Sequence, residues 1–114
     1  MTISAEQVEE LKAAFGPKVL VQSEASTEFV HIPGLKMPQG CMPVRTDALL
    51  CPSQYCGYES RLFLKDRVQS PGTPNWQASC FLLGTEWQVY SYQGVRHSSL
   101  CEMVLMHLRG LMPA

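Results

Sequence analysis

The residues whose chemistry stands out lie in one stretch, 74–88, which contains an Asn, a Cys and two Trp. Cys80 follows a long loop and precedes a short strand-like run, a place where a nucleophilic thiol could be presented. Such a nucleophile must be partly exposed and able to form the thiolate. The alternative is that Cys80 packs as a small hydrophobe, because free cysteine is among the most buried residue types. The sequence leaves both interpretations open.

The five cysteines form no pattern that predicts disulfides or a metal site. An odd number of cysteines behind an N-terminus that is not signal-like argues against a disulfide framework. Cys51 and Cys56 are five positions apart with no matching second pair. His97 and Cys101 would supply two ligands, whereas a structural zinc site needs four. We therefore predict neither a metal nor a cofactor.

Length and charge limit the function classes. At 114 residues the chain is long enough for one core, so we predict a single domain over 1–114. Nine Lys and Arg against ten Asp and Glu give a net charge of −1, and no basic face stands out, so nucleic acid is not an expected partner. No apolar run is long enough to span a membrane, so we predict a cytoplasmic protein without a membrane partner.

A helix is predicted to begin the chain over residues 5–15. Ser4 and Gln7 have the spacing of a capping box, and Gly16–Pro17 predicts the helix end. Between them, apolar residues recur at helical spacing at Val8, Leu11 and Phe15.

The middle and end of the chain predict strands, a flap and a second helix. Strands are expected at 18–23, 27–32, 45–51 and 61–65. Residues 68–74 are rich in breakers, and an irregular flap should follow before an extended run over 86–92. A second capping box at Ser99 and Glu102 should begin the last helix. The expected fold class is α+β: a helix, a four-strand antiparallel meander, the flap and a C-terminal helix.

Two local motifs sharpen this order. Pro52 and Tyr55 form a turn before an apolar strand, and Pro74–Asn75 precedes Cys80 and Trp87. With these motifs the chain resembles the ubiquitin-conjugating (UBC-like) superfamily, which carries a Pro-x-x-Tyr-Pro turn and then His-Pro-Asn, the catalytic Cys and a Trp. The resemblance covers roughly residues 2–112.

The chain departs from the family motifs at two positions and in one spacing. Cys56 stands in place of the second Pro, and Thr73 in place of the His. The gap from Asn75 to Cys80 is also shorter than the family's. The chain looks most like the divergent bacterial branch, whose members are encoded beside ubiquitin-like proteins, activating-enzyme homologues and a JAB-type deconjugating peptidase. These three classes of protein are the partners that the resemblance implies.

The resemblance implies that Cys80 accepts a ubiquitin-like modifier as a thioester and passes it to a target. It also implies that Asn75 stabilises the oxyanion of the tetrahedral intermediate. Asn75 could instead be a turn residue after Pro74, since turns favour Asn. Two other functions stay open at this point: a non-catalytic UBC-like adaptor that binds the modifier or the activating enzyme, and an unrelated small α+β scaffold.

Overall fold

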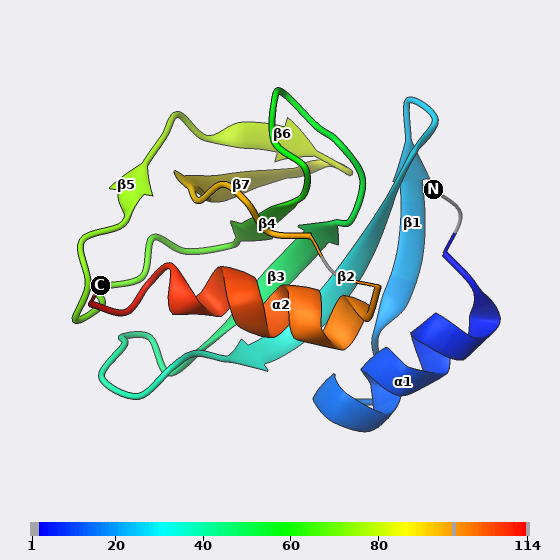
Figure 1. The fold of residues 1–114 in the computed structure, drawn as a ribbon, viewed down its shortest axis with the longest axis horizontal. Helices are drawn as coiled ribbons and strands as arrows, with labels where there is room; N and C mark the ends of the chain where they lie inside the picture. Colours follow the sequence, from blue (N-terminus) through cyan, green and yellow to red (C-terminus); the bar gives the residue numbers. More distant parts are fainter. Residues whose placement is uncertain (1–2, 97, 114) are drawn as a thin grey trace.

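Figure 1 shows the computed structural model, which describes residues 3–96 and 98–113. Helix α1 (Ala5–Phe15) has the predicted capping box: Gln7 N–H donates to Ser4 Oγ over 3.1 Å, and Ser4 N–H donates to the Gln7 side chain over 2.9 Å. Gly16 ends the helix with a φ of 122°, a left-handed conformation that favours glycine. The helix prediction is therefore confirmed at both ends.

The strands form one antiparallel sheet, and with the two helices they confirm the α+β class. They are β1 (Leu20–Glu24), β2 (Thr27–Lys36), β3 (Arg45–Cys51), β4 (Arg61–Leu64), β5 (Asn75–Trp76), β6 (Cys80–Leu82) and β7 (Thr85–Ser91). Their order is β1-β2-β3-β4-β7-β5, with β6 paired to β7. The first four strands form the expected meander, and β7 extends the sheet beside β4.

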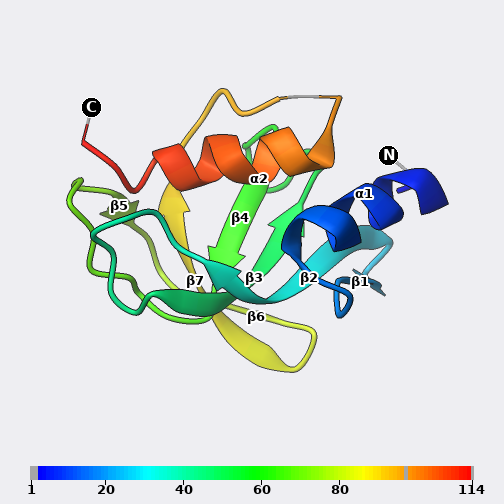
Figure 2. The same ribbon diagram turned by 90° about the horizontal axis from the view of Figure 1, so that it is seen from below.

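Helix α2 (Leu100–Arg109) crosses one face of the sheet, and α1 lies on the same side (Figures 1 and 2). Helix α2 begins as predicted, because the Glu102 N–H donates to Ser99 Oγ over 3.3 Å. No helix within the described residues is long and apolar enough to cross a membrane.

The sheet separates two apolar clusters, because alternate residues of a strand point to opposite faces. The helix-side core contains residues from the sheet and both helices, including Leu11, Val30, Ile32, Ala48, Leu50, Leu62, Leu64, Tyr90, Val104 and Leu108. The far-side core contains Phe29, Leu49, Cys51, Phe63, Leu82, Trp87 and Val89. Figure 2 shows the β6–β7 hairpin on the side of the sheet away from the helices. Both faces of the central strands are therefore covered.

Two predictions about the strands need correction. The flap is more regular than expected, because β6 and β7 form a hairpin whose turn residues Leu83 and Gly84 have φ angles of 52° and 77°. Two successive positive φ angles match the twist of tight hairpin turns. Strand β2 also continues past its predicted end at Ile32, because Pro33–Gly34 forms a bulge between Ile32 and Leu35 and does not end the pairing.

Candidate functional site

Cys80 is the first residue of β6 and lies opposite Trp87 of β7. It is half-buried, and its side chain packs on the edge of the far-side core. The next residue, Phe81, is 73% exposed on the other face of the hairpin. Trp87 is buried, and its indole N–H donates to the Leu82 carbonyl over 3.1 Å, which fixes the hairpin. Cys80 therefore sits on an ordered element, with part of its surface open to solvent.

Tyr55 lies beneath this hairpin. Its ring makes edge contacts with Phe29 and Phe63, at centroid distances of 6.0 Å to each. Burial, followed by the nearby thiols of Cys56 and Cys80, raises the pKa of Tyr55. The phenol is consequently protonated at neutral pH and can donate a hydrogen bond. Tyr55 and Cys80 both pack against the far-side core.

Asn75 and Cys80 are not brought together. Asn75 is exposed on β5 and pairs with Ser91, whereas Cys80 pairs with Trp87. Four positions along β7 correspond to about 13 Å of extended strand, which is beyond the reach of an Asn side chain. An oxyanion formed on an acyl group at Cys80 is therefore not within hydrogen-bonding distance of Asn75 in this arrangement.

The other cysteine thiols differ in their exposure to solvent. Cys56 is exposed, next to Tyr55, in a left-handed conformation with φ 50°. Cys51 is fully buried at the end of β3, and burial raises its pKa. Cys41 lies in the loop between β2 and β3, yet it is 4% exposed and packs in the helix-side core, and burial raises its pKa too. Burial likewise raises the pKa of Cys101. Cys56 is thus the exposed thiol, Cys80 and Cys101 are half-buried, and Cys41 and Cys51 are closed to a macromolecular substrate.

No pattern in the sequence predicts the buried cation that lies beside β5. Arg61 is 6% exposed, and its Nη2 donates to Gln77 Oε1 over 2.6 Å and to the Tyr90 carbonyl over 3.3 Å. Its guanidinium lies 3.8 Å from the centroid of the Tyr58 ring. The Tyr58 hydroxyl is 2.7 Å from Ser91 Oγ, and this hydrogen bond is the main reason that the Tyr58 pKa is lowered. These contacts fix β5, and with it Asn75, to the sheet.

A Ser–His pair was also not predicted. Ser60 Oγ lies 2.9 Å from His107 Nε2, and both residues are 2% exposed. The Ser60 hydroxyl donates to the Val95 carbonyl over 2.8 Å, so its proton is not directed at the imidazole. The pair cannot meet a substrate and does not have the geometry of an activated serine nucleophile. It links β4, the segment after β7 and α2.

Among the described residues, no group of three or more His, Cys, Asp or Glu side chains could hold a metal ion. His97, the sequence neighbour that could have joined Cys101, lies outside the described residues. Comparison of the chain with protein-family models, curated proteins and solved structures gave no match. The function therefore has to be argued from the geometry.

Proposed function

We propose that this chain is a UBC-like protein that accepts a ubiquitin-like modifier from an activating enzyme as a thioester on Cys80. The observation that carries the proposal is that Cys80 lies on the β6–β7 hairpin and packs against the same far-side core as Tyr55. The element order supports it: a first helix, an antiparallel meander of four strands and a last helix across the sheet. An aromatic ring packed under the cysteine-bearing segment is also what the UBC-like motif implies for Tyr55.

The proposed loading step is a transthioesterification. The Cys80 thiolate attacks the carbonyl carbon of the modifier's C-terminal thioester, a new C–S bond forms, and the carbonyl becomes an oxyanion. When the oxyanion collapses, the old C–S bond breaks and the activating enzyme's thiolate leaves. Attack by a nucleophile of the target then releases the Cys80 thiolate. Because Asn75 is too distant, we assign the Tyr55 hydroxyl as the donor that stabilises the oxyanion.

A loading assay tests the proposal. The protein is mixed with ATP, an activating enzyme and a ubiquitin-like modifier, and the products are separated without reductant. Wild type should give a reductant-sensitive adduct, Cys80→Ser a reductant-resistant ester, and Cys56→Ser a normal thioester. Tyr55→Phe should slow loading by ~100-fold, the scale of losing one oxyanion donor. An adduct that persists as a thioester in Cys80→Ser and disappears in Cys56→Ser would refute the assignment.

The second candidate is a non-catalytic UBC-like adaptor that binds the modifier, the activating enzyme or the JAB-type peptidase. The separation of Asn75 from Cys80 favours it, because the family's donor and nucleophile act together. In this case the protein should bind one of these partners and never become covalently loaded. The same assay distinguishes the two functions, provided that the activating enzyme forms its own thioester in the reaction.

A further inference from the structure

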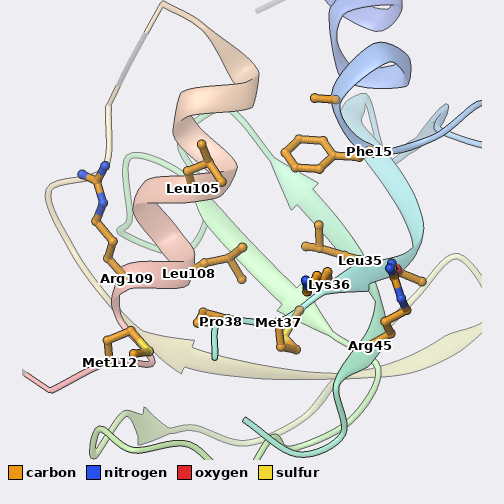
Figure 3. Close-up of a pocket in the computed structure, with 12 residues that line it drawn as sticks. Phe15, Leu35, Lys36, Met37, Pro38, Arg45, Leu105, Leu108, Arg109 and Met112 are labelled. Atoms are coloured by element: carbon orange, nitrogen blue, oxygen red, sulfur yellow. The ribbon is translucent and has the colours of Figure 1, made fainter. Parts of the chain in front are cut away.

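A depression on the helix side of the described molecule lies away from Cys80. It has a volume of about 630 Å³ and is bounded by the end of α1, the last turns of α2 and the β2–β3 connection (Figure 3). Apolar side chains line most of it: Phe15, Leu35, Met37, Pro38, Leu105, Leu108 and Met112. A volume between ~300 and ~1,000 Å³ with an apolar lining is typical of small-molecule sites.

The polar residues of this groove are all cations: Lys36, Arg45 and Arg109. Arg109 lies in the last turn of α2, where the helix dipole already favours a positive charge. Lys36 and Arg45 have no such explanation. They are directly opposite each other in the β2–β3 register, where like charges destabilise a sheet.

Among residues 3–96 and 98–113, neither cation of this pair has an acidic side chain within ion-pair distance. Over residues 3–96 and 98–113, the ion pairs join Lys12 to Glu9 and Arg96 to Glu59. Arg45 Nη1 donates to the Gly34 carbonyl over 3.1 Å, and this neutral acceptor holds the guanidinium at the groove. Lys36 and Arg45 are exposed, so an anion from solvent can reach both.

From these observations we propose that the groove binds a free single-chain carboxylate, such as a fatty acid. The carboxylate lies between Lys36 and Arg45 and relieves their repulsion. The hydrocarbon chain lies between Phe15 and Leu105, which face each other across the groove in Figure 3. Leu105 is 42% exposed on α2, and the chain would cover it. An apolar lining joined to cationic side chains, with no acidic residue in the lining, favours a ligand that has one anionic head and one apolar chain.

Calorimetric titration of the intact protein with dodecanoate, below its micelle concentration, tests the site. Wild type should bind one ligand saturably. The double variant Lys36→Gln/Arg45→Gln should bind ~10-fold more weakly or worse, because a charge-assisted contact is lost. Lys65→Gln is the matched control, since Lys65 is an exposed cation away from the groove, and its affinity should equal that of wild type.

Two further measurements distinguish the contribution of the ligand's carboxylate from that of its hydrocarbon chain. Leu105→Gln changes an exposed helix position that folding tolerates, and it should weaken binding with both cations in place. Methyl dodecanoate, which has the same chain without the charge, should bind ~10-fold more weakly than dodecanoate. The proposal is overturned if wild type shows no saturable binding, if the double variant binds like Lys65→Gln, or if the ester binds as tightly as the acid. It is also overturned if an acidic amphipathic peptide binds this face and dodecanoate does not.

Discussion

Acid should destabilise this fold at His107. Its imidazole is buried under α2, and Nε2–H donates to Ser60 Oγ, whose own proton is directed to the Val95 carbonyl. A second proton on the ring would have to be held in a dry environment near the Arg61 guanidinium. Burial first, and this positive charge second, lower the pKa of His107 from 6.5 to about 4.

The sign and size of the effect follow from proton linkage. Between pH 6.5 and 4 the unfolded chain binds a proton at His107 and the folded chain does not, so stability is lost as the pH falls through this window. Each tenfold difference in proton affinity corresponds to ~1.4 kcal/mol, which gives a limit of about 3 kcal/mol. About 2 kcal/mol of this should already be lost at pH 5, relative to pH 7.5.

Urea unfolding at a series of pH values between 7.5 and 4.5 measures this loss as a fall in the unfolding midpoint. His107→Gln keeps an N–H donor at this position but has no titrating group. The pH dependence that remains in this variant therefore comes from the carboxylates, and the difference from wild type is the contribution of His107. The variant should lose about 2 kcal/mol less than wild type between pH 7.5 and pH 5. Equal pH slopes for the two proteins would show that His107 is not the acid-sensitive group.

Two further predictions concern access and close packing. A disulfide exchange reagent should label Cys56 in the folded protein within seconds, and Cys41 and Cys51 only after unfolding. Mass spectrometry of quenched samples measures the labelling. Fast labelling of Cys51 in buffer would contradict its burial. Gly72→Ala should lower the free energy of unfolding by ~1–3 kcal/mol, because an added Cβ would lie 2.5 Å from the Met112 carbonyl oxygen. Gly72 does not have the left-handed φ that strains an alanine, so an unchanged free energy of unfolding for Gly72→Ala would show that the chain accommodates the added Cβ.

The parts of the fold that the sequence predicts are those set by local chemistry. The capping pair Ser4 and Gln7 and the cap Ser99 depend on neighbours three residues away, and the structure confirms the helix starts. Strand β3 was recognisable because Ala48 to Leu50 form an almost continuous apolar run, and each of these residues is fully buried. In each case the deciding contact or pattern lies within a few positions of the chain.

The parts that were missed depend on partners distant in the chain. Strands β5 and β6 are two and three residues long, which is too short for an alternation of apolar and polar residues to be recognised. They form only because their backbones pair with β7. The same pairing spreads Asn75 and Cys80 along β7, although they are only five positions apart in the sequence. The groove likewise joins residues from four separate segments, and no local motif could have predicted it.

The two proposed sites can be tested independently because they lie on opposite faces of one sheet. On β3, Ala48 and Leu50 belong to the helix-side core, whereas Leu49 and Cys51 belong to the far-side core. A substitution at any of these buried positions would disturb both faces through the shared strand. The exposed groove residues Lys36, Arg45 and Leu105 belong to neither core, so their variants should leave the surroundings of Cys80 intact. If a groove variant binds dodecanoate more weakly but is loaded normally on Cys80, the groove is the binding site. If the variant loses both dodecanoate binding and loading, it is unfolded.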